Sequence, residues 1–277
     1  MNPPSWWYLK RPGMLIPVFF LSLISAQGQF HAGEASVAAA GESFATRSGF
    51  SSAMLNQAGL ARIRRPAVAL HHQQPFLTGE VSVSSLVFQL PVSPGAFGFN
   101  YSSWGIRGLR HSAAWISYGL DLRPDLSVGM GMHFHFSSIP GEPFHCWGAS
   151  CALGIQFMVN DDLSLGAHVM HPAGWSNAMT DGRIQEMMIT TGISYSFFQK
   201  AIFYADLHIR SGDFLQTGFG LETGITDHVR LCLGMHNVPL SLACGVEVQH
   251  HSWSIQIASQ YVIDHGSIPH ASLAYTF

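Results

Sequence analysis

Six ionisable residues in the last third of the chain have the types and the spacing to do chemistry together. They are Asp206, His208, Arg210, Glu222, Arg230 and Glu247. Each lies in a segment of alternating apolar and polar residues, so we expect all six on one face of a sheet. A tight turn centred on Asp227 would place Glu222 diagonal to Arg230. A loop at Asn237–Leu240 would place Arg230 directly opposite Glu247.

This polar cluster has three interpretations. It could form a polar constriction, or it could anchor another segment of the chain. The simplest alternative is an ordinary ladder of ion pairs on a wetted wall, each pair worth about 0.2–1 kcal/mol. The residue pattern favours the ladder of ion pairs.

Histidine is abundant, with 16 residues, and two histidines have metal-ligand spacing. His133 and His135 lie two positions apart in an alternating segment, so their imidazoles share a face. Such a pair can chelate Zn²⁺ if a third ligand is present, and His111, His168 and His208 point to the same side. The alternative is a wettable lining of imidazoles, and we expect no metal or other cofactor.

Catalysis has little support in the pattern. The apolar face carries His72, His171 and His250 as candidate bases for a hydrolytic triad, but none has a Ser and a carboxylate on the same face nearby. No Gly-rich phosphate loop or zincin motif occurs. We therefore predict that the protein is not an enzyme.

The elements that position these residues begin at Pro66. From there the chain alternates with period 2 between turn residues, which predicts about fourteen strands. The predicted strands are Ala67–Gln73, Glu80–Leu90, Ala96–Trp104, His111–Leu122, Leu126–Phe136, His145–Val159, Leu163–Met170, Gln185–Phe198, Ala201–Arg210, Leu215–Ile225, Val229–His236, Ser241–His250, Trp253–Asp264 and Ala271–Phe277.

The chemistry of the two faces favours a membrane barrel over a soluble β-sandwich. The face opposite the apolar one carries mainly Ser, Gly, Thr and His, whereas a solvated sandwich face favours Lys and Glu. Charged residues are only 10% of the chain, and consecutive strands without a crossover suit a closed meander that has no edges. We predict an all-β, antiparallel up-and-down transmembrane barrel. The net charge of −3 argues against a nucleic-acid partner.

The two ends of the chain indicate the compartment. Residues 1–28 resemble a signal peptide, with Lys10 and Arg11 before an apolar core and small residues before position 29. The chain ends on the amphipathic strand Ala271–Phe277, and aromatic residues favour the bilayer interface. The short turns follow the even strands, which places both barrel ends in the periplasm. We predict a Gram-negative-type outer membrane, with its lipid as a partner.

Four cysteines occur in the chain, and two of them flank one turn. The alternation places Cys232 on the polar face and Cys244 on the apolar face. Because side chains on opposite faces of a hairpin cannot meet, we predict free thiols at both positions.

Residues 29–65 have no period-2 pattern and are rich in small residues, so we predict irregular chain with a short helix or two that packs inside the barrel of residues 66–277. Within this hatch, Asn56-Gln-Ala-Gly-Leu60 resembles the Asn-Pro-Ala-Gly-Leu signature of the FadL superfamily of outer-membrane barrels, and the chain looks most like its short PorV/PorQ-type members. The resemblance carries over Asn56, Ala58 and Gly59. Gln57 departs from the family's Pro, which would fix φ and remove an N–H group.

The resemblance implies two functions of different kinds. PorV/PorQ-type barrels are scaffold or docking parts of type IX-like protein secretion, with secretion-machinery or cell-surface proteins as partners. FadL-type barrels are passive conduits for small hydrophobic solutes. The length and short loops favour the first. The sequence also predicts that the longest outer loop begins at His171, with Pro172, Gly174 and Trp175 in it. There Trp175 would reach the interface or cap the pore, or the loop is a plain turn.

Overall fold

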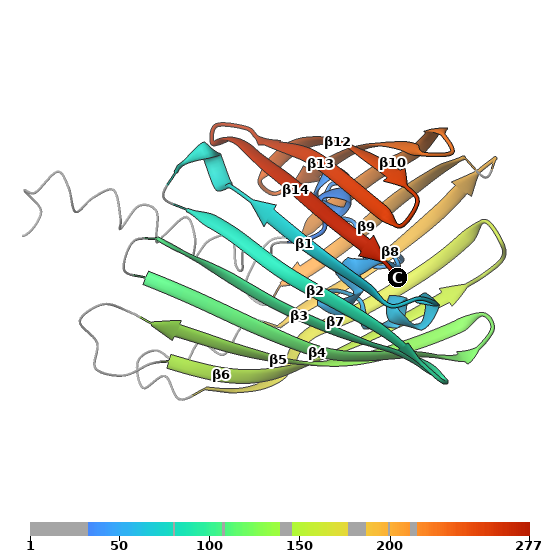
Figure 1. Cartoon of the computed structure of the whole chain (residues 1–277), viewed down its shortest axis with the longest axis horizontal. Helices are drawn as coiled ribbons and strands as arrows, with labels where there is room; N and C mark the ends of the chain where they lie inside the picture. The colour runs from blue at the N-terminus through green and yellow to red at the C-terminus, as the bar shows by residue number, and fades with distance from the viewer. Residues whose placement is uncertain are drawn as a thin grey trace, which may run out of the picture. The chain divides into compact units, whose positions relative to one another are not determined.

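The computed structural model describes residues 33–79, 81–106, 109–138, 146–176, 187–198, 200–210 and 215–277. Fourteen antiparallel strands close into one barrel, in which every strand pairs with its neighbours in sequence (Figure 1). The barrel closes where β1 pairs with β14, with Val68 opposite Tyr275 and Leu70 opposite Leu273. The predicted all-β meander of fourteen strands is confirmed, and so is its closure by the first and last strands.

The strand bounds follow the predicted alternation closely. The strands are β1 Ala67–Gln73, β2 Ser82–Val92, β3 Gly95–Ile106, β4 Leu109–Arg123, β5 Leu126–Ser138, β6 Cys146–Met158, β7 Leu163–Ser176, β8 Met188–Phe197, β9 Ala201–Arg210, β10 Gln216–Thr226, β11 Val229–Asn237, β12 Leu240–His250, β13 Trp253–Val262 and β14 Gly266–Thr276.

Each strand has an apolar outward face, and the inward faces carry mainly polar and small residues. In β5 the outward Met130 is 59% exposed, whereas the inward His133 is 2% exposed. Cys232 points inward and is buried, Cys244 points outward and is exposed, and both are free thiols, as the alternation predicts. The side chain of Cys146 lies outside the described residues.

Several strands extend by one or two residues beyond their predicted bounds, and β7 and β14 extend much further. Strand β7 continues to Ser176 because the β6–β7 ladder resumes beyond a bulge: Ala152 pairs with Met170, and Ser150 pairs with Gly174. Strand β14 starts at Gly266 and includes Pro269. Proline lacks a donor, but the Pro269 carbonyl still accepts a hydrogen bond from Gln74 N at 3.1 Å.

The connections after even-numbered strands are short, and several after odd-numbered strands are longer. This gives the barrel a short-turn rim and a long-loop rim. The first strand begins at the short-turn rim and the last strand ends there, because an even number of strands returns the chain to its starting side. In the described part of the chain, no helix is long and apolar enough to cross a membrane.

The segment before β1, residues 33–65, is folded inside the ring of strands, where Figure 1 draws it in blue. It contains three short helices: α2 Ala35–Ala39, η2 Phe50–Ala53 and η3 Gln57–Arg62. Helix α2 packs against β11 to β14, and η3 packs against β3 to β6. A fourth short helix, η4 Pro75–Leu77, lies in the connection from β1 to β2. We call residues 33–65 the hatch.

Candidate functional site

The hatch fits the barrel because glycines on the wall leave space for its backbone. A Cβ atom at Gly129 would lie 2.2 Å from Gln57 C, and a Cβ atom at Gly234 would lie 2.1 Å from Gly41 N. Real Cβ atoms do not approach other atoms this closely, so any larger residue would displace the hatch. Wall glycines with comparable contacts to hatch atoms are Gly119, Gly154, Gly166, Gly218 and Gly220.

Asn56 connects the hatch to itself and to the wall. Its side-chain oxygen accepts from Ala58 N at 3.2 Å and so caps the start of η3. Its amide nitrogen lies 2.5 Å from Ala45 O in the hatch, and 3.3 Å from both Ile155 O and Ala167 O in the wall. A primary amide supplies both the acceptor and the donors for these contacts.

The other motif residues are selected for size. Ala58 is fully buried. A Cβ atom at Gly59 would lie 2.3 Å from Ser52 Oγ and 2.5 Å from Arg47 O. Gln57 is the first residue of η3, a position at which proline also fits because its N–H is not needed by the helix.

Asp206 fixes the middle of the hatch to strand β9. Its Oδ2 atom accepts hydrogen bonds from Phe44 N at 2.6 Å and Ala45 N at 2.7 Å. Asp206 is buried, and charge-assisted hydrogen bonds of this kind are among the strong ones in proteins. Within the predicted polar cluster, Asp206 is therefore a direct contact to the hatch.

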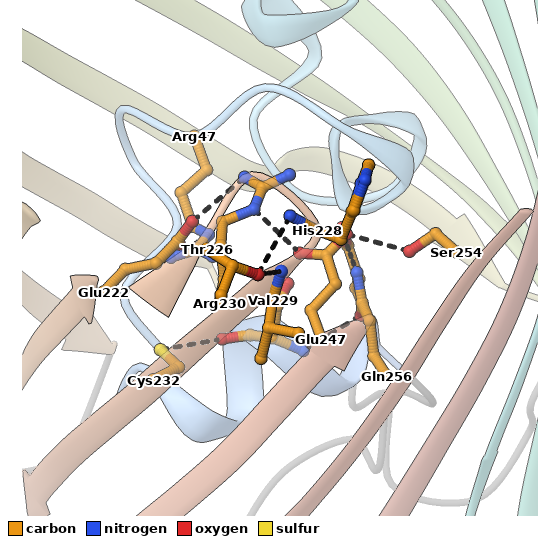
Figure 2. A network of polar contacts seen from close by, with 12 residues as sticks. Arg47, Glu222, Thr226, His228, Val229, Arg230, Cys232, Glu247, Ser254 and Gln256 are labelled. Atoms are coloured by element: carbon orange, nitrogen blue, oxygen red, sulfur yellow. Dashed lines mark hydrogen bonds and ion pairs between the residues drawn. The ribbon is translucent and has the colours of Figure 1, made fainter. Parts of the chain in front are cut away.

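Arg47 of the hatch joins an ion-pair chain on β10 to β12 (Figure 2). Its guanidinium lies 2.8 Å from Glu222, and Arg230 lies 3.2 Å from the other oxygen of Glu222 and 3.5 Å from Glu247. The register matches the sequence argument, since Arg230 pairs with Glu247 across the ladder. Arg47 and Glu222 are 8% and 10% exposed, whereas Arg230 is 42% exposed.

Glu34 makes a second polar contact near the start of the hatch. Gln256 Nε2 donates to its Oε1 atom at 2.8 Å, and Ser51 N donates to its Oε2 atom at 3.3 Å. Burial opposes ionisation of Glu34, but the Gln256 bond, the positive potential of His71 and Arg47, and the Ser51 N–H hold the pKa of its carboxyl below the ordinary value. A cavity of about 10 Å³ beside Ser36, Cys232 and Gln256 has room for about one water molecule.

The remaining predicted residues lie apart from this chain of ion pairs. His208 Nδ1 is 3.0 Å from Thr190 Oγ1, and Arg210 is the last residue of β9, opposite Met188. His133 stacks on Trp115 with 4.0 Å between ring centroids, and His135 is a half-buried neighbour of His133. In the described part of the chain, no three His, Cys, Asp or Glu side chains are arranged to hold a metal ion.

The predicted loop at Pro172, Gly174 and Trp175 is a correction, because the structure places all three residues in β7. The bulge at His171 to Ala173 absorbs the Pro-Ala-Gly sequence, and pairing with β6 then resumes. Trp175 is 60% exposed on the outward face and packs edge-on against Trp147 at 4.6 Å. It therefore belongs to the outer wall and does not cap the interior.

An apolar cluster lies inside the barrel, between the hatch and the wall. Its wall residues Trp115 and Met170 are buried and lie in the halves of β4 and β7 nearer the long-loop rim. The hatch residues in the same cluster are Val37, Phe44, Met54 and Leu55. Two other buried clusters of hatch and wall residues consist mainly of alanines, so among the described clusters this one has the large apolar side chains that suit a hydrophobic molecule.

Comparison with known proteins places the fold among hydrocarbon transporters. The Ralstonia pickettii toluene transporter TbuX superposes with a TM-score of 0.66 and 16% identity, over 88% of this chain and 98% of that one. The Pseudomonas putida toluene transporter TodX gives 0.70 and 11%, over 90% and 98%. A Pseudomonas aeruginosa FadL homologue gives 0.66 and 12%, over 88% and 98%. No family model and no curated protein sequence matches the chain.

Sequence reasoning missed the hatch partners of the polar cluster, above all Arg47. A signal was present: Glu34, Glu42 and Arg47 are isolated charges in a segment of Ala, Gly and Ser. A charge inside such a segment needs a partner when it is buried. The sequence could therefore have predicted that each of these charged hatch residues has a partner on the barrel wall. It could not have predicted which wall residue that partner is.

Proposed function

We propose that this protein is an outer-membrane barrel that conducts small hydrophobic solutes passively, with the hatch as its plug. The single observation that carries the proposal is the apolar cluster of hatch and wall residues inside a barrel whose fold is that of toluene transporters. The exposed apolar outward face supports a lipid environment. Short turns face the periplasm in outer-membrane barrels, so the short-turn rim of this barrel would face the periplasm of a Gram-negative-type cell.

A solute would enter from the long-loop side, because the wall residues of the apolar cluster lie nearer that rim. Phe44 and Met54 would contact the solute from below, and Trp115 and Met170 from the wall. These hatch residues are also held by polar anchors, since Asp206 binds the backbone at Phe44. Passage therefore requires the hatch to move, and its anchors set how readily it does so.

A second candidate is the PorV/PorQ-like scaffold of a protein-secretion apparatus. The observation that favours it is the filled interior: hatch backbone lies against wall glycines, and buried ion pairs hold it there. A scaffold that docks other proteins needs a stable barrel, but it does not need a path for solutes through the barrel. Its partners would be secretion-machinery or cell-surface proteins, and it would not transport hydrocarbons.

Uptake of radiolabelled toluene by a porin-deficient Gram-negative host separates the two candidates. We expect uptake above that of cells with the empty vector, and a several-fold loss in Met170→Gln, which puts an amide into the apolar cluster. Leu165→Gln is the matched control, because Leu165 lies on the outward face of the same strand. Heat-modifiable migration in outer-membrane fractions verifies that each barrel is folded. Uptake no higher than in the empty-vector cells, together with stable co-purification of surface proteins, would support the scaffold instead.

A further inference from the structure

Three buried histidines on the inner wall have hydrogen-bonding atoms that nothing in the described structure satisfies. They are His208 on β9, His236 on β11 and His270 on β14, all at most 7% exposed. His208 Nε2 and both ring nitrogens of His236 and His270 lack a hydrogen-bond partner. A buried polar atom without a partner destabilises the folded state, so three such side chains require an explanation.

One of the three imidazoles, that of His236, lies beside a carboxylate of the hatch, Glu42. His236 Nε2 lies 4.0 Å from Glu42 Oε2, and Gln260 Nε2 donates to Glu42 Oε1 at 3.3 Å. His208 and His270 also interact electrostatically with Glu42. The Glu42 side chain is 48% exposed, so a solute that approaches from solvent meets it before the buried imidazoles.

The backbone at Glu42 is strained. Its φ angle is +62°, a left-handed conformation that a glutamate rarely adopts. Residues held in this way tend to occur at binding and active sites, where the surrounding structure enforces them. The strain therefore supports a functional reason for placing a carboxylate at this point of the hatch.

The group formed by Glu42 and the three histidines borders the apolar cluster described above. The ring of Phe44, two residues after Glu42, lies 5.3 Å from the ring of His208, and His208 lies 6.1 Å from His236. Phe44 also belongs to the apolar cluster that contains Met170 and Trp115. One molecule could therefore place an apolar body against Phe44 and a polar group among the imidazoles.

The chemistry of the cluster selects the polar group. The imidazoles are not arranged to hold a metal ion, within the residues that the structure describes. Glu42 would repel a carboxylate. A neutral imidazole has an N–H donor on one nitrogen and an acceptor on the other. The N–H of one ring and the unprotonated nitrogen of a second ring can together satisfy a hydroxyl group, which accepts one bond and donates another.

We propose that His208, His236, His270 and Glu42 form a subsite for the neutral hydroxyl group of a small apolar solute of the phenol class. The inference rests on the proposed conduit, because the solute must reach the interior. It goes further by naming a head group: a phenol is preferred over the hydrocarbon with the same ring and over the matching carboxylate.

Equilibrium binding to the purified full-length chain in lipid nanodiscs tests the subsite without requiring transport. The probes are 4-methylphenol, toluene and 4-methylbenzoate, which share a ring and differ in the head group. We expect 4-methylphenol to bind about tenfold more tightly than toluene, as one or two added hydrogen bonds would give. We expect 4-methylbenzoate to bind more weakly than either. Glu42→Gln removes the negative charge, so it should reduce the difference in affinity between 4-methylbenzoate and 4-methylphenol.

The decisive variants are His236→Phe and His270→Phe, which keep a ring and remove only nitrogens that have no hydrogen-bond partner among the described residues. A purely structural role predicts lower thermal stability. The subsite predicts unchanged or raised stability, unchanged toluene affinity, and 4-methylphenol affinity reduced to that of toluene. His72→Phe is the control, because His72 lies exposed on the outward face and bonds Ser84.

Equal affinity for 4-methylphenol and toluene in the wild-type protein would overturn the proposal and would mean that the imidazoles bind water only. A phenol preference that survives in both histidine variants would overturn it too. The proposed conduit fails separately, if the cells take up neither toluene nor 4-methylphenol above background. Binding without uptake would leave the subsite standing and refute the conduit.

Discussion

Asn56 shows how much of the hatch depends on one side chain. Its oxygen caps η3, and its nitrogen lies near three carbonyl oxygens, one in the hatch and two in neighbouring strands. No other residue type of this size carries both an acceptor and two donors. The resemblance to a family motif at this position thus has a physical cause, which is the attachment of η3 to β6 and β7.

Asn56→Asp tests that cause, because it keeps the acceptor and removes the donors. A carboxylate would then face the carbonyls of Ala45, Ile155 and Ala167, so we expect the hatch to lose about 1–3 kcal/mol of local stability. Hydrogen exchange of residues 44–62 should accelerate, while the strands stay protected. Asn160→Asp, in an exposed turn, is the control. Unchanged exchange in the Asn56 variant would contradict this role.

The two arginines of the ion-pair chain should contribute unequally to the stability of the hatch. Arg47 is almost fully buried against Glu222, whereas Arg230 is partly exposed. Removing one partner of a buried pair costs about 3–5 kcal/mol, but an exposed pair is worth at most about 1 kcal/mol. We expect Arg47→Met to make the hatch accessible to protease in intact barrels and Arg230→Met to have little effect. Equal digestion of both variants would mean that these ion pairs do not anchor the hatch.

At the scale of elements, the bounds of the strands were predictable, whereas the conformation of the hatch was not. Alternation sets the strands: in β9, Phe203 and Leu207 point outward, whereas Tyr204 and Asp206 point inward. The register follows from the turns, which is how Arg230 could be placed opposite Glu247. The hatch has no such period, because its conformation is imposed by the wall. The bulge in β7 was missed for a related reason, since Pro172 reads as a turn unless the β6 partner is known.

The wall glycines permit a test of this fit at the element scale. Gly234→Ala adds a methyl group at 2.1 Å from Gly41 N, whereas Gly224→Ala meets no atom closer than 3.9 Å. Both positions lie in strands, and neither has a left-handed φ angle that would exclude an alanine. We expect Gly234→Ala to displace residues 39–41 and to raise their hydrogen exchange, with Gly224→Ala unchanged. Wild-type exchange in the Gly234 variant would show that the hatch adapts without loss.

At the scale of the whole molecule, the hatch contacts opposite arcs of the barrel. Helix α2 contacts β11 to β14, η3 contacts β3 to β6, and the stretch between them is held by Asp206 and Glu222. A plug attached on both sides opens only if at least one attachment yields. The conduit therefore depends on hatch movement, whereas a scaffold does not.

A reversible cross-link between the hatch and the wall tests whether solute uptake depends on movement of the hatch. Ala53 Cβ lies 2.9 Å from the position of a Cβ atom at Gly98, close enough for a disulfide after a small adjustment. In a background with the native cysteines replaced, Ala53→Cys with Gly98→Cys joins η2 to β3. We expect oxidation to stop toluene uptake and reduction to restore it. Ser84→Cys with Ser103→Cys, a directly opposed pair between β2 and β3, controls for oxidation of the wall alone. Uptake that persists at full cross-linking would mean that solutes pass without movement of η2, and the path would then have to follow the α2 side of the hatch.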